Sequence, residues 1–112
     1  MSRIAQTFAL LSIAVLLAVS AQASPSNKWR LQFSGGSHSA GEIVIELTPV
    51  GADAILVTVP VPDKKSENAV AKHVVEVLRS KLSDDAFHIE RDDGEDVLIK
   101  KRHGAANFDL TV

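Results

Sequence analysis

The segment from Ser37 to Gly41, with the sequence SHSAG, carries the residue types of a nucleophile elbow, in which a serine lies on a sharp turn between glycines. Ser37 occupies the position of the first glycine, and the segment joins two predicted strands instead of a strand and a helix. The pattern is therefore not that of an elbow, and we predict no catalytic residue. A small secreted hydrolase that uses His38 with a nearby serine or carboxylate stays open as an alternative function.

Metal-binding side chains are present, but their spacing is not that of a metal site. No two histidines have the separation that zinc sites use, because they are dispersed along the chain at His38, His73, His88 and His103. The acidic segment 92–96 lacks the alternating spacing and the distant glutamate of a calcium loop. We predict no metal and no cofactor, and we interpret this segment as a charged hairpin tip. The basic run 100–103 is interpreted as solubilising charge.

The N-terminal segment has the three parts of a cleavable export signal. Arg3 supplies a positive charge, and Phe8–Val19 is apolar except for one serine. Ala21 and Ala23 place small side chains at the −3 and −1 positions that signal peptidase requires, so cleavage is expected just before Ser24. As a helix, the apolar stretch would span roughly 18 Å, which is short of the ~30 Å hydrocarbon core of a bilayer.

Composition and charge narrow the class of protein that follows the signal. We expect residues 1–23 to be removed and residues 24–112 to form one small domain, exported to the periplasm or the outside of a bacterial cell. The chain has no cysteine, so neither a disulfide nor a lipid anchor can form. A net charge of −2 gives no electrostatic reason to expect nucleic acid or an anionic membrane as a partner.

Three strands are predicted before the middle of the chain. Residues 28–33 alternate strictly between apolar and polar side chains, which is typical of a half-buried strand. Residues 42–48 and 54–59 are rich in isoleucine and valine and flank a segment with turn chemistry, so we expect an antiparallel hairpin. The expected cross-strand pairs are Leu47 with Ile55, Ile45 with Val57, and Ile43 with Val59.

One helix and three further strands complete the pattern. Residues 67–82 repeat apolar side chains at helical spacing, with Ser66 as the N-cap. Residues 86–91 and 95–101 are expected to form a hairpin with a three-residue loop, in which Gly94 takes the left-handed conformation. That loop pairs Ile89 with Val97 and Phe87 with Ile99, in preference to a two-residue turn. Residues 108–112 alternate again and form the last strand.

The predicted fold is an α+β domain in the order βββαβββ, with an antiparallel-dominated sheet of about five to six strands and one helix packed on one face. A single helix leaves the other face of the sheet uncovered. On that face the expected pairings place three apolar side chains among polar neighbours, and we predict them as an interaction surface: Val44, Leu56 and Leu98. The glycine- and serine-rich loop 34–41 is expected to be the most mobile element.

These features predict an exported, non-enzymatic domain that binds another protein. The contact would use the open sheet face, the loop 34–41, or a sheet edge at residues 28–33 or 108–112. The partner is an unidentified protein or a second copy of this chain. A structural subunit of an envelope or surface assembly is the other open alternative, and it requires self-association.

Overall fold

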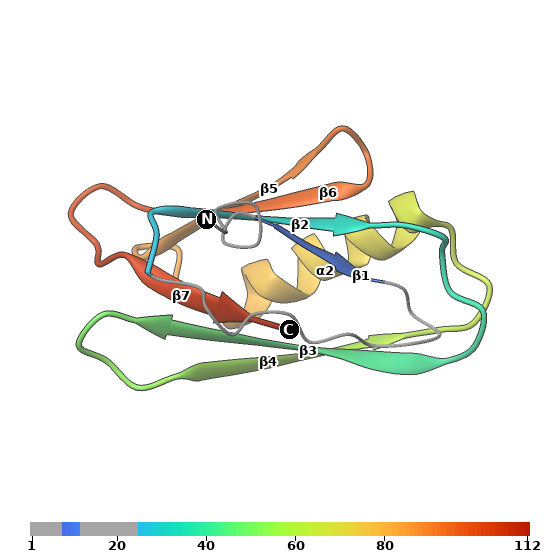
Figure 1. Ribbon diagram of the computed structural model, residues 1–112, viewed down its shortest axis with the longest axis horizontal. Helices are drawn as coiled ribbons and strands as arrows, with labels where there is room; N and C mark the ends of the chain where they lie inside the picture. The colour runs from blue at the N-terminus through green and yellow to red at the C-terminus, as the bar shows by residue number, and fades with distance from the viewer. Residues whose placement is uncertain (1–7, 12–24) are drawn as a thin grey trace.

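The computed structural model describes residues 8–11 and 25–112. The expected cleavage site at Ala21, Ala23 and Ser24 lies outside the described residues. One short strand, β1, lies inside the predicted signal segment, and all the other elements lie after it (Figure 1).

The elements confirm the α+β class and the order βββαβββ from residue 28 onward. A strand within the first twenty-three residues was not expected. The bounds are β1 Phe8–Leu11, β2 Lys28–Phe33, β3 Gly41–Pro49, β4 Ile55–Val61, α2 Glu67–Lys81, β5 Phe87–Asp92, β6 Asp96–Lys101 and β7 Phe108–Thr111.

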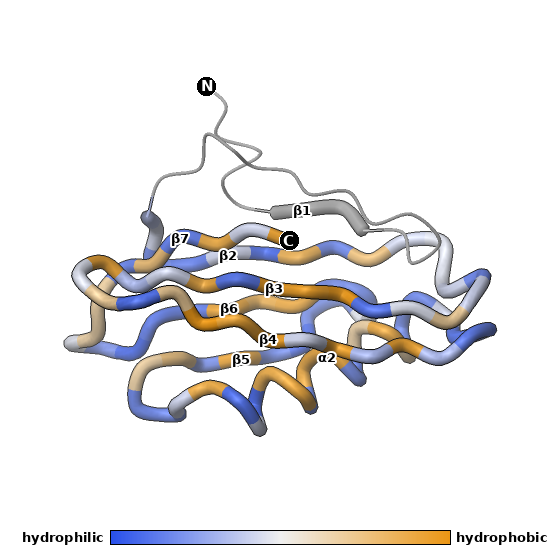
Figure 2. Tube along the Cα trace, turned by 90° about the horizontal axis from the view of Figure 1, so that it is seen from below, coloured by the Kyte–Doolittle hydropathy of each residue, from blue (hydrophilic) through white to orange (hydrophobic). Residues whose placement is uncertain are grey.

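The strands are divided between two sheets, where a single sheet was expected. A four-stranded sheet has the order β1-β2-β6-β5, and a three-stranded sheet has the order β4-β3-β7. The two sheets lie as facing layers (Figure 1), and α2 runs along one flank beside β4 and β5, opposite the flank of β2 and β7 (Figure 2). Period-2 alternation shows which side of a strand is buried but not which sheet the strand joins, and both sheets bury one side.

The core lies between the sheets and under the helix. Its members are the inward residues of every strand from β2 onward together with the apolar stripe of α2. Trp29 joins the two layers, because its indole Nε1 donates a 2.8 Å hydrogen bond to the main-chain oxygen of Phe108. The ring of Phe108 packs edge-on against Phe87, with centroids 5.1 Å apart. The start of β7 is thereby fixed to the opposite sheet.

The helix begins and buries one face as the sequence predicts. Ser66 is the N-cap, and its hydroxyl accepts a hydrogen bond from the Ala69 amide. Val70, Val74 and Leu78 are buried in the stripe that faces the sheets. Because β-branched residues lower intrinsic helix propensity, this helix depends on that docking for its stability.

The β3–β4 hairpin has the predicted register, with Leu47 opposite Ile55 and Ile43 opposite Val59. The second strand is longer than predicted, since it continues through Pro60 to Val61. Proline lacks the N–H that an inner strand needs, but β4 is an edge strand, and the nitrogen of Pro60 faces away from β3.

The predicted register of the β5–β6 hairpin is wrong by two residues. Ile89 lies opposite Ile99 instead of Val97, and the three-residue loop is closed by Asp92 opposite Asp96. Gly94 has the predicted positive φ, at +76°. Two like charges directly opposite one another are unfavourable in an isolated hairpin. Here Arg30 on the neighbouring strand β2 pairs with both carboxylates.

The centre of the loop 34–41 is bonded to the segment that precedes α2, and the mobility expected of this loop stays a prediction. The Ser37 hydroxyl donates to the Pro62 carbonyl at 2.8 Å and accepts from the Lys65 amide at 2.6 Å. The Ser37 amide also donates to the Lys65 carbonyl at 2.8 Å. Gly36 has a φ of +66°, and a Cβ at this position would lie 2.5 Å from that same carbonyl oxygen. This glycine is therefore required for a close main-chain approach.

Replacing Gly36 with alanine should destabilise the domain far more than replacing its neighbour. Gly35→Ala meets no atom within 4 Å and carries only the left-handed penalty of about 1–2 kcal/mol. Gly36→Ala adds the clash with Lys65, for a total of roughly 2–4 kcal/mol. Urea unfolding followed by tryptophan fluorescence measures both. If both variants lose the same free energy of unfolding, the close approach of Gly36 to Lys65 does not contribute to stability.

Candidate functional site

Two of the three predicted surface residues lie together. Val44 on β3 and Leu56 on β4 are on the outer face of the three-stranded sheet, with exposed fractions of 36% and 66%. Val44 pairs with Thr58 and Leu56 pairs with Glu46, so the two apolar side chains are diagonal neighbours across the hairpin. They form a small exposed apolar surface bordered by polar residues.

Leu98 does not belong to that surface. It lies on β6, in the other sheet, and is only 7% exposed. Its cross-strand neighbours on the outer face are Arg30 and Glu90, whose long side chains flank it on both sides. All three residues were expected on one uncovered face, but the division into two sheets separates Leu98 from Val44 and Leu56.

A charged cluster occupies the outer face of the four-stranded sheet near the β5–β6 loop. The Arg30 guanidinium lies 2.7 Å from Asp96 Oδ2 and 3.0 Å from Asp92 Oδ2. The hydrogen bond to Asp96 is the main cause that raises the pKa of Arg30 above its usual value. The Asp96 side chain is 10% exposed, and its second oxygen, Oδ1, is buried with no hydrogen-bond partner among the described residues. Arg30 is therefore the main group that stabilises the buried negative charge of Asp96.

A second set of charges follows along the same face. Glu90 Oε1 lies 2.9 Å from His88 Nε2 and 3.5 Å from Lys100 Nζ. The hydrogen bond from His88, with the charge of Lys100, lowers the pKa of Glu90 below its usual value. These groups are half exposed, and such pairs contribute little to stability in water.

The residues considered for catalysis lie together in the loop 34–41, but one serine of that loop is occupied by hydrogen bonds. The Ser37 hydroxyl is engaged with main-chain groups in the loop 34–41, and His38 beside it is exposed. Within residues 8–11 and 25–112, no three histidine, cysteine or acidic side chains gather closely enough to hold a metal ion. In the same part of the chain, no helix has both the length and the apolar character needed to cross a membrane.

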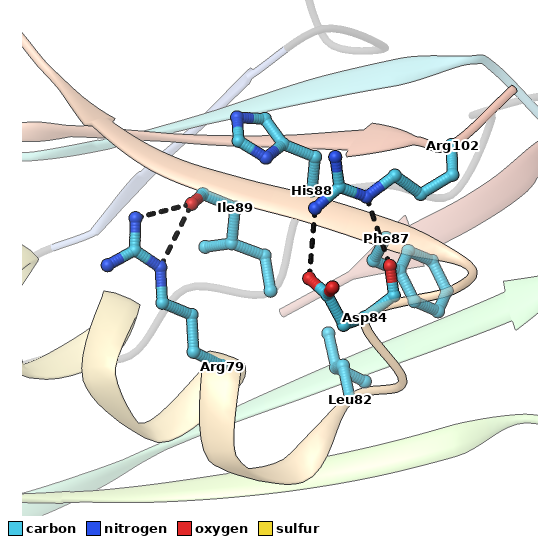
Figure 3. Close-up of a pocket in the computed structure, with 7 residues that line it drawn as sticks. All are labelled: Arg79, Leu82, Asp84, Phe87, His88, Ile89 and Arg102. Carbon is cyan, nitrogen blue, oxygen red and sulfur yellow. Dashed lines mark hydrogen bonds and ion pairs between the residues drawn. The ribbon is translucent and has the colours of Figure 1, made fainter.

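A cavity of about 370 Å³ opens between the end of α2 and β5 (Figure 3). Its apolar floor includes Leu82, Phe87 and Ile89. Arg102 at one side is bound to Asp84, through a 3.0 Å bond to the carbonyl and a 2.9 Å bond to the carboxylate. Figure 3 shows the Arg79 guanidinium directed at the Ile89 carbonyl from the other side. The guanidinium groups of Arg79 and Arg102 are thus occupied by hydrogen bonds within the domain.

The contact of Arg79 also closes a sheet edge. β5 is an edge strand, and its Ile89 carbonyl accepts hydrogen bonds from Arg79 Nε at 3.1 Å and Nη2 at 2.8 Å. On the other sheet, the Pro60 carbonyl of edge strand β4 accepts a 2.8 Å bond from His73 Nε2. Side chains from one helix therefore occupy main-chain acceptors of both strands that flank it.

The edge of β2 is closed in a different way. The amide of Phe33 donates to Glu95 on the β6 side, so the alternating main-chain groups of Arg30 and Gln32 face the other side. Those groups face β1, which pairs with β2 in parallel, with Phe8 opposite Arg30 and Leu11 opposite Phe33. Among the described elements, β1 is the one strand that covers this edge.

The beginning of the same edge is closed within the domain. Ser26 exchanges main-chain hydrogen bonds of 2.9 and 3.0 Å with Phe108, and its hydroxyl contacts both the amide and the carbonyl of Lys28. The part of the β2 edge that depends on β1 is therefore restricted to Arg30 and Gln32. Sequence reasoning named residues 28–33 as a possible edge but had no signal for which main-chain groups are free.

Comparison with the models of protein families, with curated proteins and with solved structures finds no match for this chain.

Removing the Arg30 charge should destabilise the domain by about 1–3 kcal/mol, because Asp92 and the buried Asp96 then face each other without a counter-ion. Arg30→Gln makes this change, and urea unfolding measures it. The double variant Arg30→Gln with Asp96→Asn should recover most of the loss, since the buried group becomes neutral. Arg91→Gln, an exposed change in the same hairpin, is the control and should stay within about 0.5 kcal/mol of the unaltered chain. A loss for Arg30→Gln no larger than that of the control would contradict this account.

Proposed function

We propose that this chain is an exported, non-enzymatic domain that binds an extended segment of another protein by strand addition at the edge of β2. The observation that carries the proposal is the parallel pairing of β1 with β2. β1 lies within residues 1–23, which the sequence predicts to be removed on export. Removal would leave the outward N–H and C=O groups of Arg30 and Gln32 without their partner.

An open edge of this kind is a template for an added strand. Main-chain hydrogen bonds supply affinity, and alternate side chains of the added strand supply specificity. The segment that pairs with this edge has the sequence FALL, so we propose an extended, uncharged, apolar segment as the occupant. Its direction is parallel to β2.

The remaining margins favour β2 over the other strands as the binding edge. β4 and β5 lie beside α2, which bonds to one outward carbonyl on each strand, on β4 through His73 and on β5 through Arg79. At the start of β7, the N–H and C=O of Phe108 are taken by Ser26. β2 has two residues whose outward main-chain groups depend on a segment expected to leave.

A peptide with the sequence of residues 5–14 should bind the exported product, purified from cells that express the full coding sequence. Binding should slow amide hydrogen exchange at Arg30 and Gln32 at least tenfold, because both amides gain a hydrogen-bond partner. NMR exchange rates with and without the peptide measure this, and fluorescence anisotropy of a labelled peptide gives the affinity.

Two proline variants distinguish strand addition at the β2 edge from nonspecific binding of the peptide. Gln32→Pro removes an outward N–H from β2 and should weaken peptide binding at least tenfold. Thr58→Pro removes an outward N–H from β4 and should leave binding unchanged, since edge strands tolerate proline at such positions. Binding that is equal in the two variants, or an exported product that still contains residues 1–23, would overturn the proposal.

Self-association is the second candidate, favoured by the exposure of Val44 and Leu56 side by side on the three-stranded sheet. Paired copies would bury both side chains. Light scattering should then show a dimer or a larger assembly at micromolar concentration. The double variant Val44→Lys with Leu56→Lys should be monomeric and folded. A monomer before any substitution would exclude this candidate and the assembly-subunit alternative with it.

A further inference from the structure

A shallow hollow of about 400 Å³ lies where the start of β2 meets the end of β6. Its lining comes from β2 and the residue before it, from β6, and from the turn that follows β6, and it consists of Asn27, Lys28, Lys100, Lys101 and His103. No carboxylate is among these lining residues. Three of the five lining residues are lysines, and Lys28 and Lys100 lie on the same face of the sheet.

The arrangement places like charges close together. Lys28 lies directly opposite Lys100 in the β2–β6 pairing, and like charges at directly opposed positions destabilise a sheet. Lys100 has one anionic neighbour, Glu90, at 3.5 Å, and Glu90 also accepts a shorter hydrogen bond from His88. Within the described part of the chain, the ammonium groups of Lys28 and Lys101 form no ion pair within 4.0 Å. An anion bound in the hollow would relieve this repulsion.

We infer that this hollow binds a compact oxyanion, phosphate or sulfate, either free or as an ester group on a larger molecule. The lysine ammonium groups supply charge and hydrogen-bond donors, and the Asn27 amide adds a neutral donor. The hollow is open on one side, so the remainder of an esterified molecule can extend into solvent. Neither Arg30 nor Gln32 lines the hollow, so the site is separate from the main-chain groups that serve the proposed strand addition.

The test is a ¹H–¹⁵N NMR titration of the chain expressed from its full coding sequence. Inorganic phosphate should produce saturable shifts at Asn27, Lys28 and Lys100, with an affinity in the millimolar range. Sodium chloride at the same ionic strength should not. A second arm uses phenyl phosphate, and tighter binding of this ester than of inorganic phosphate would show that the site prefers an esterified group.

Matched variants locate the site. Lys28→Gln should weaken phosphate binding roughly threefold to tenfold, because one charge-assisted contact is lost. Lys81→Gln removes an exposed lysine from the last turn of α2 and should leave the affinity unchanged. The spectra themselves report whether each variant is folded. Shifts that do not saturate, that occur equally with chloride, or that weaken equally in both variants would overturn the inference, whatever the outcome of the peptide experiment.

Discussion

Unpaired main-chain groups at the margins of two small sheets constrain this structure more than any other feature. An edge strand exposes N–H and C=O groups that require partners or protection. α2 lies along the flank formed by β4 and β5, where it buries its apolar stripe and bonds to both strands through His73 and Arg79. On the opposite flank, Ser26 closes the beginning of β2 by bonding to β7. The rest of the β2 edge, at Arg30 and Gln32, is covered by β1. It differs from the other edges because its partner strand lies in the segment that the sequence predicts to be removed.

Arg30 shows how a neighbouring strand decides a local register. Considered alone, the β5–β6 hairpin favours a three-residue loop 92–94 that pairs Ile89 with Val97, because this loop gives Gly94 the left-handed position and keeps the apolar side chains on one face. The observed register places Asp92 opposite Asp96 instead. In the folded domain, β2 brings a guanidinium within 3.0 Å of both carboxylates, so the like-charged pair becomes acceptable. A hairpin register can therefore be settled by a residue more than sixty positions away.

Periodicity predicted the elements well because it reports burial directly. The inward side chains of the β5–β6 hairpin were predicted correctly in spite of the wrong register, since a shift of two residues keeps each side chain on its face. Periodicity does not report which strands become neighbours. The separation of Leu98 from Val44 and Leu56, and the approach of Gly36 to Lys65, depend on contacts between distant parts of the chain. Neither leaves a local pattern in the sequence.

The hydrogen bond from Trp29 to Phe108 links residues 79 positions apart, and β2 pairs with β6 across almost the whole domain. Folds dominated by such distant pairings form slowly. The chain must lose the conformational entropy of closing a long loop before the contacts that offset this loss can form. A newly made chain can therefore complete these contacts only when residues near its far end are available. A chain whose fold is still incomplete can pass through a channel that is too narrow for the folded domain.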